Sequence, residues 1–163
     1  MDEPVVVERV EQPYAAISAT VTMAGLATEL PPLIGEVFGW LAGQGVEPAG
    51  PPIWRYRLID MARELLVDVG VPVATAVSGN DRIVGDVLPA GKYVTVTHVG
   101  HPDELAGVTG ELLAWAERGG LTWDMTPTGQ SELWGCRLEE YLTDPAEEPD
   151  MTRWATRLAF RLA

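Results

Sequence analysis

Apolar and polar residues alternate in several stretches of the chain, and a spacing of two is the pattern of a β-strand with one buried face. Two other stretches place apolar residues three and four positions apart, which predicts helices over 30–43 and from Asp103 to about Arg118. Pro31 suits a first helical turn, and Asp103 suits an N-cap. The alternating stretches predict strands over 5–10, 15–23, 51–60, 64–74, 92–99, 131–143 and 153–163.

The order of these elements occurs twice, because three short motifs recur in the same order at offsets of 75 to 80 residues. A duplicated strand-helix-strand-strand unit explains this recurrence, and the offset is too long for a solenoid repeat. We expect one α+β domain over 1–163, with repeats over about 1–76 and 84–163 and a link or short hairpin within 74–91. The paired motifs are PYAAISATV (13–21) with KYVTVTHVG (92–100), WLAGQGV (40–46) with WAERGGL (115–121), and WRYRLID (54–60) with WGCRLEE (134–140).

Two such units would form one antiparallel sheet with two helices on one face. A pseudo-twofold axis would pass between the units, and a duplicated fold most easily leaves a cleft at that axis. The fold class therefore already indicates where a binding site would lie.

Composition and charge narrow the classes of function. The chain has 24 acidic and 11 basic residues, for a net charge of −13. Such a surface repels nucleic-acid phosphates and anionic membranes, so neither is an expected partner. The apolar runs are too short to cross a bilayer, and no secretion leader is visible. The lone Cys136 cannot form an internal disulfide, which suits a cytoplasmic location.

Glu139 is the acidic residue that breaks the internal symmetry. Aligning the repeats on their Trp-x-x-Arg-Leu motifs places Ile59 opposite Glu139, whereas Glu140 has an acidic counterpart. The fold therefore does not require an acid at the position of Glu139, which makes it the candidate functional carboxylate, while Glu140 is expected to be structural or exposed. An ion pair of Glu139 with Arg137, Arg157 or another surface arginine is the alternative.

The aromatic composition is unusual, with six Trp and four Tyr against two Phe. Trp and Tyr combine a flat apolar face with a polar edge, and both are common where a protein meets a ligand. No group of His, Cys and acidic residues has metal-ligand spacing, and no phosphate-binding loop or nucleophile motif is visible. We therefore expect no metal and no cofactor.

Five segments together resemble the GyrI-like, or AraC-type effector-binding, domain family of multidrug-binding modules. The resemblance implies the same α+β fold and a small-molecule site. No helix-turn-helix segment is visible at either end, so a stand-alone binding protein is expected rather than a DNA regulator. The segments cover nearly the whole chain in the family's order: GPPIWRY (50–56), LPAGKYVTVTHVGHPDEL (88–105), LLAWAERGGL (112–121), LEEYLTDP (138–145) and TRWATRLAFRL (152–162).

The resemblance also implies the site residues. Glu139 occupies the acid of the family pattern E-x-Y-L-x-D-P, which lies at the floor of the pocket and faces a ligand's positive charge. Tyr141 follows on the same strand face and can donate a hydrogen bond, and Trp154 matches an aromatic residue that walls the ligand. Trp134 is a further candidate, although the face it is expected to share with Cys136 favours the core. Segments expected to border the pocket add Pro52, Trp54, Tyr56, His101 and Leu105.

The candidate residues and the family resemblance favour three functions. The first is binding of planar hydrophobic, often cationic, compounds, which exchange water for aromatic faces and a carboxylate. The second, implied by GyrI-like hydrolases, opens strained three-membered rings of electrophilic natural products (a cyclopropanoid hydrolase), with Glu139 as general base and Tyr141 polarising the leaving side. The third is a protein-interaction role, as in family members that inhibit DNA gyrase. It ranks last because no acidic run is long enough to look like a DNA mimic.

Overall fold

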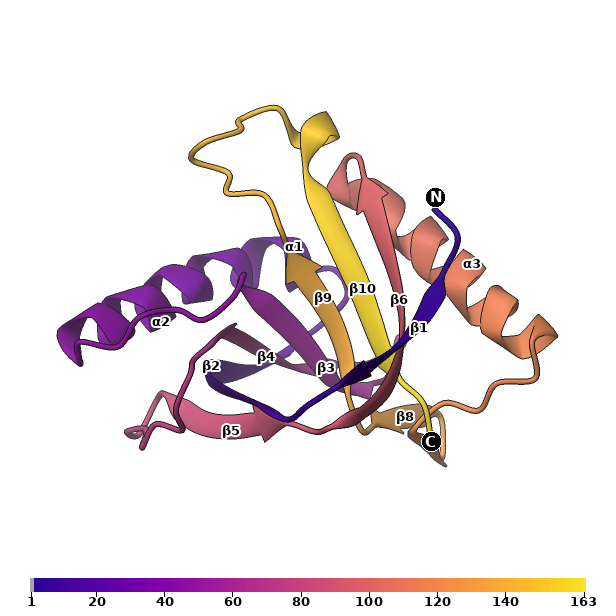
Figure 1. The fold of residues 1–163 in the computed structure, drawn as a ribbon, viewed down its shortest axis with the longest axis horizontal. Helices are drawn as coiled ribbons and strands as arrows, with labels where there is room; N and C mark the ends of the chain where they lie inside the picture. The colour runs from indigo at the N-terminus through magenta and orange to yellow at the C-terminus, as the bar shows by residue number, and fades with distance from the viewer. Residues whose placement is uncertain (1) are drawn as a thin grey trace.

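The computed structural model describes residues 2–163 and shows ten strands in one curled antiparallel sheet that carries its helices on one side (Figure 1). The strands are β1 (Val5–Arg9), β2 (Gln12–Val21), β3 (Ile53–Ile59), β4 (Leu65–Pro72), β5 (Val84–Leu88), β6 (Gly91–Val99), β7 (Met125–Thr128), β8 (Ser131–Trp134), β9 (Arg137–Tyr141) and β10 (Ala155–Arg161). The helices are α1 (Leu26–Glu29), α2 (Pro31–Gly43) and α3 (Leu105–Arg118), with 3-10 turns η1 (Pro102–Glu104) and η2 (Met151–Arg153).

The strand order confirms the duplicated α+β fold. The main path runs β1-β6-β10-β9-β3-β4-β2-β5. Exchanging β1 with β5, β2 with β6, β3 with β9, and β4 with β10 turns this order into its own reverse. A pseudo-twofold axis therefore passes between β3 and β9, the two strands that pair at the centre. The residue boundaries of the two repeats remain a prediction.

The first strand of each repeat pairs with the other repeat. β1 pairs with β6, and β5 pairs with β2. The link 74–91, predicted from its Gly and Pro content as a connection or short hairpin, thus supplies an edge strand of the sheet. Neither half can form its complete set of strand pairings alone, because each contributes a strand to its partner.

Two local predictions were wrong. The stretch 131–143, predicted as one strand, is two strands broken at Gly135, where the backbone N–H donates to the carbonyl of Asp124 and the Asp124 carboxylate lies where a Cβ would be. The predicted N-cap Asp103 is also not the cap. His101 accepts a hydrogen bond from the Asp103 N–H through Nδ1, and Glu104 accepts one from the His101 N–H, which forms a capping box at the start of η1.

Both faces of the sheet are covered by packed side chains. Each of the two acids of β9 therefore faces other side chains of the protein. The larger core cluster joins the helices to the sheet and includes Leu112 of α3, Leu158 and Phe160 of β10, and Tyr56. A second cluster fills the other side of the central strands and includes Tyr93 and Leu138 together with the buried thiol of Cys136. Within residues 2–163, no helix combines the length and apolar character that crossing a membrane requires.

The first repeat holds a buried polar network around Asp68, whose side chain has no exposed surface. Its carboxylate accepts hydrogen bonds from the hydroxyls of Tyr14 (2.6 Å) and Ser18 (2.5 Å) and from Nε of Arg57 (2.7 Å). Arg57 extends the network to Asp86 at the surface. The network therefore joins side chains of β2, β3, β4 and β5 on the face opposite the helices.

Candidate functional site

β9 presents two neighbouring acids to opposite faces of the sheet, and their surroundings differ. Glu140 is only 7% exposed and accepts two hydrogen bonds from Arg9 (2.9 and 3.1 Å) and one from Nε of Arg157 (2.8 Å). Burial alone would raise the pKa of Glu140, but the bonds from Arg9 and Arg157 hold that pKa below its usual value. Glu140 is therefore a neutralised structural acid, in agreement with the structural role expected for it.

Glu139 has no arginine partner. Its Oε1 accepts hydrogen bonds from the hydroxyls of Tyr56 (3.0 Å) and Tyr141 (2.5 Å). No basic side chain of residues 2–163 lies within 4.0 Å of its carboxylate, and Arg157, the alternative partner suggested by the sequence, binds Glu140 instead. Burial raises the pKa of Glu139 above its usual value, and the two phenol hydrogen bonds and the charge of Arg137 offset this only in part.

The second carboxylate oxygen of Glu139 has no partner within the described chain. Both phenol hydrogen bonds go to Oε1, and the residue as a whole is half-buried, so Oε2 is the oxygen left for a ligand. Trp54 lies directly opposite Glu139 in the β3–β9 pairing, and its ring meets that of Tyr141 edge to face at 5.3 Å. A carboxylate, two phenols and an indole thus gather on the two strands beside the pseudo-twofold axis.

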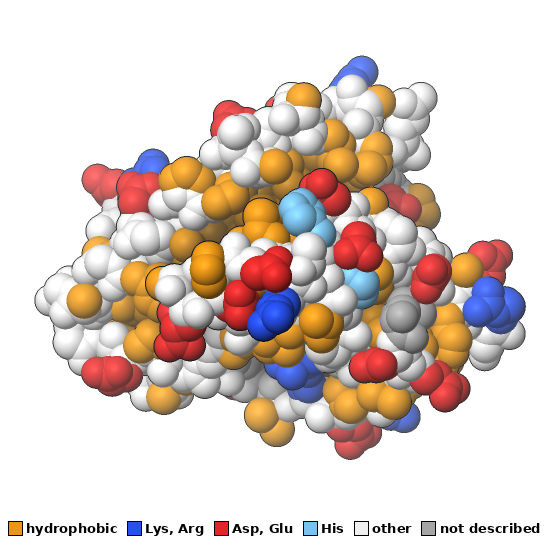
Figure 2. All heavy atoms as spheres, turned by 90° about the horizontal axis from the view of Figure 1, so that it is seen from above, with side chains coloured by type: hydrophobic (Ala, Val, Ile, Leu, Met, Phe, Trp, Pro, Cys, Tyr) orange, Lys and Arg blue, Asp and Glu red, His pale blue; other side chains and the backbone are white. Residues whose placement is uncertain are grey.

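This group lies on the helix-bearing side of the sheet. Figure 2 looks onto the end of the molecule at which β9 finishes, and hydrophobic side chains gather there along a hollow.

Burial raises the pKa of Tyr56 and Tyr141, and the neighbouring Glu139 charge adds to the effect, so both phenols are protonated donors at neutral pH.

The other predicted residues lie at different distances from this group. Pro52 is adjacent, because its carbonyl accepts a hydrogen bond from the backbone N–H of Tyr141 (2.9 Å). Trp154 is half-buried after η2, and its Nε1 donates to the carbonyl of Glu148 (2.7 Å) in the loop that follows β9. His101 caps η1, and Leu105 begins α3 within the larger core cluster. The structure does not join these last three to Glu139 by a hydrogen bond.

Trp134 lies in the core rather than beside Glu139. It is 4% exposed and packs against Trp123 and Phe160 at ring distances of 5.8 and 5.6 Å. The prediction that it shares a face with Cys136 was wrong. The strand breaks at Gly135, so Trp134 and Cys136 point to opposite faces of the sheet and pack in different core clusters. Its role in ligand binding remains a prediction.

Sequence reasoning missed Arg137 as a site residue and considered it only as an ion-pair partner. Its guanidinium lies over the rings of Phe160 (4.6 Å), Trp134 (4.9 Å) and Tyr56 (5.8 Å). Strand alternation could have indicated it, because Arg137 precedes Glu139 by two residues and therefore shares its face. Nothing in the sequence indicated the three rings that surround it.

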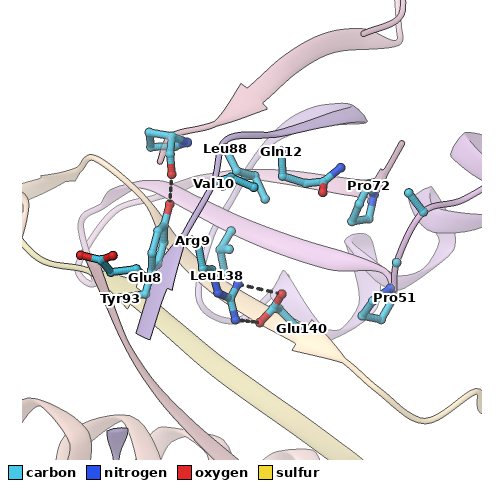
Figure 3. Close-up of a pocket in the computed structure, with 13 residues that line it drawn as sticks. Glu8, Arg9, Val10, Gln12, Pro51, Pro72, Leu88, Tyr93, Leu138 and Glu140 are labelled. Carbon is cyan, nitrogen blue, oxygen red and sulfur yellow. Dashed lines mark hydrogen bonds and ion pairs between the residues drawn. The ribbon is translucent and has the colours of Figure 1, made fainter. Parts of the chain in front are cut away.

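The larger cavity and the Glu139 carboxylate lie on opposite faces of the sheet. A cavity of about 450 Å³ lies on the Glu140 face, between β1 and the loops before β3 and after β4 (Figure 3). Its polar wall is the Arg9–Glu140 ion pair, whose charges already satisfy each other (Figure 3). A smaller cavity of about 250 Å³ lies between His98 and α3. We place the candidate site at Glu139, outside both cavities, because its carboxylate is half-buried, has a raised pKa and has no ion-pair partner among residues 2–163.

Comparison with known proteins identifies the family and the fold. The sequence profile described as "GyrI-like small molecule binding domain" matches residues 2–163. No curated protein sequence matches the chain. The crystal structure of the EcmrR C-terminal domain is similar, with 19% identity, a TM-score of 0.67, and coverage of 99% of this chain and 97% of that one. In the EcmrR–DNA complex the match has 18% identity and a TM-score of 0.68, and it covers 98% of this chain but only 57% of EcmrR.

Two further solved structures have the same fold. SAV2435, solved bound to tetraphenylphosphonium, shares 9% identity at a TM-score of 0.64, with coverage of 99% of this chain and 94% of that one. A hydrolase from Listeria innocua shares 15% identity at a TM-score of 0.63, with coverage of 99% and 92%. At these identities the likeness establishes the fold of the chain.

Proposed function

Because the chain belongs to the GyrI-like small-molecule-binding domain family, we propose that it binds large hydrophobic cations, planar ones included, at Glu139, between the tyrosines and Trp54. One observation carries the proposal. The half-buried Glu139 carboxylate has no ion-pair partner among residues 2–163, and its two phenol hydrogen bonds leave Oε2 unused. An enclosed anion without a countercharge is costly, and a ligand that brings the positive charge removes that cost.

The aromatic surroundings favour a large and weakly hydrated cation. Such a cation gains roughly 0.5–2 kcal/mol from each good contact with an aromatic face. Coulomb attraction to Glu139 strengthens as the ligand displaces water. The net charge of −13 also raises the local concentration of cations around the protein. SAV2435, which has the same fold, was solved with tetraphenylphosphonium, a cation of this class.

Binding of tetraphenylphosphonium should weaken as the pH falls. The pKa of Glu139 is raised, so the carboxylate takes up a proton above the pH at which an ordinary glutamate does. Affinity should therefore rise with pH through the pKa of Glu139 and then level off. Calorimetric titrations from about pH 4 to about pH 8 would measure this, with neutral triphenylphosphine oxide as the control ligand. Affinity for the cation that does not change over this range would contradict the proposal.

A second candidate function is hydrolytic opening of a strained ring, and the short Tyr141–Glu139 contact favours it. A water oxygen bonds to a ring carbon, the ring carbon–carbon bond breaks, and the released electron pair moves to a conjugated carbonyl oxygen. Glu139 takes the proton of the water. The carbonyl oxygen takes a proton from Tyr141, which regains one from Glu139, so the net reaction is addition of water. The Listeria innocua hydrolase has the same fold.

Replacing Tyr141 with phenylalanine separates the two functions. If the chain is a hydrolase, the variant should open a cyclopropane-bearing alkylator about 10²–10⁴-fold more slowly, because the proton donor is lost. Its affinity for tetraphenylphosphonium should change far less, because the phenyl ring remains. Product formation followed by liquid chromatography would measure this. If the wild-type protein forms no product above the uncatalysed rate, the hydrolase function is wrong for the substrates tried.

A further inference from the structure

Arg137 is a partly buried cation that forms no ion pair within the described residues, although Glu139 and Glu132 act on it from farther away. No carboxylate of residues 2–163 lies within 4.0 Å of its guanidinium, although Arg9, Arg57 and Arg157 each reach one. Its Nε is buried and makes no hydrogen bond, and its two terminal nitrogens also make none within the described chain but are not buried. Arg137 therefore has hydrogen-bond donors that the described chain does not use.

The rings around Arg137 fix its direction but do not use its donors. Its guanidinium lies over Phe160, Trp134 and Tyr56, and aromatic faces stabilise a cation without accepting its N–H groups as a carboxylate would. Burial lowers the pKa of Arg137, yet an arginine in a protein stays charged at neutral pH. A guanidinium held in place by three rings is preorganised for a planar, bidentate oxyanion.

Arg137 and Glu139 form a dipolar pair on one strand face. Two residues along a strand place their Cα atoms about 7 Å apart. Their charged ends attract each other but form no ion pair within 4.0 Å. Tyr56 spans the gap, because its hydroxyl binds Glu139 and its ring lies under the Arg137 guanidinium. The helix-bearing face therefore offers a negative group and a positive group at a fixed separation, with an aromatic surface between them.

We infer that Arg137 is the oxyanion-recognising group of the Glu139 site, and that the preferred ligands are aromatic compounds carrying both a cationic and an anionic group. This inference rests on the proposed function, since it extends the Glu139 site by one residue. A carboxylate or phenolate of the ligand binds the free N–H groups of Arg137 while the cationic end meets Oε2 of Glu139. A ligand that is only cationic satisfies Glu139 and leaves Arg137 unpaired.

Two related dyes test the inference. Rhodamine 110 is a zwitterion with a free carboxylate, and rhodamine 123 is its methyl ester and a plain cation. We expect the wild-type protein to bind rhodamine 110 more tightly than rhodamine 123 in fluorescence anisotropy titrations. Replacing Arg137 with glutamine should weaken rhodamine 110 about tenfold or more, because a charge-assisted contact is lost. The same variant should weaken rhodamine 123 much less than rhodamine 110, because the ester has no carboxylate for Arg137 to bind.

The outcomes distinguish the role of Arg137 from cation binding at Glu139. Equal loss of both dyes in Arg137→Gln, or loss of neither, would assign Arg137 a packing role and overturn the inference while leaving the proposed function standing. Failure of the wild type to bind either dye would overturn both. If Arg137→Gln does not fold, Arg137→Lys keeps the charge but loses the planar fork, and it should weaken rhodamine 110 selectively. A wild-type preference for rhodamine 123 would contradict the inference without any variant.

Discussion

Glu139→Gln should bind tetraphenylphosphonium roughly 10–100-fold more weakly than the wild-type protein, with no loss of stability. An enclosed carboxylate next to a bound cation contributes about 1.5–3 kcal/mol, which corresponds to that range of affinity. Glutamine keeps the shape and can still accept hydrogen bonds from Tyr56 and Tyr141, so only the charge is removed. Calorimetric titration of the cation into both proteins would measure the change.

The same variant should be as stable as the wild type, or more stable, at neutral pH. The pKa of Glu139 is raised in the folded protein. The stability due to its protonation is therefore fully present below the unfolded pKa and is lost as the pH rises through the folded pKa. At neutral pH the wild type carries an enclosed charge that glutamine does not have. Thermal unfolding at neutral pH would measure this, and a much lower Tm would show that Glu139 is a structural acid.

Glu140→Gln is the matched control, since it removes the neighbouring charge on the same strand. Glu140 is held by Arg9 and Arg157 on the opposite face, so its loss leaves two arginines without their shared partner. The pKa of Glu140 is lowered, so its ionised form stabilises the fold above the unfolded pKa, and this stability is lost as the pH falls. Glu140→Gln should therefore lower the Tm at neutral pH and leave cation affinity unchanged. If the two variants lose cation affinity equally, the binding charge is not specific to Glu139.

Asp68→Asn should lower the free energy of unfolding by about 3 kcal/mol, because it removes the charge that compensates buried donors. Asp68 is fully buried and binds Tyr14, Ser18 and Arg57 at once. For a chain of this length the loss corresponds to a fall in Tm of roughly 6–12 °C. Urea unfolding followed by circular dichroism would measure the free energy.

Asp86→Asn is the control for that experiment. Asp86 also pairs with Arg57, but its side chain is 47% exposed, so water replaces the lost partner. Its removal should cost less than about 1 kcal/mol. If the two substitutions have the same effect, the buried position of Asp68 is not what makes it important, and the network of the first repeat is weaker than its hydrogen bonds indicate.

The repeat explains how a single sequence pointed to one acid out of 24. Residues at equivalent positions of a duplicated unit meet similar packing, so an acid that faces an apolar counterpart is not required by the fold. The symmetry therefore favours Glu139 over Glu140 as the functional acid without any knowledge of contacts. It could not show that Glu140 is buried as well, because burial of the second face depends on β1 and β10, which bring Arg9 and Arg157 from distant parts of the chain.

The wrong and missed predictions arise where the structure depends on contacts between distant residues, which local sequence patterns do not show. Alternation predicts the face of a side chain only while the strand continues, and the break at Gly135 moves Trp134 to the face opposite the predicted one. The edge strand β5 is short and partly exposed, so its apolar pattern is weak, and only its pairing with β2 makes it a strand. The rings around Arg137 come from β3, β8 and β10, and no local pattern joins them.

Most of the elements, the duplication and the net charge follow from the order of residues alone, because periodicity and internal symmetry are properties of that order. The same symmetry makes Glu139 the candidate acid. Only the tertiary structure decided which groups surround that acid. The central pairing of β3 with β9 brings Tyr56, 83 positions away, into hydrogen-bond contact with Glu139 and places Trp54 opposite it. Contacts between residues so far apart depend on how the sheet closes. Within residues 2–163 that closure leaves Glu139 and Arg137 each without an ion-pair partner.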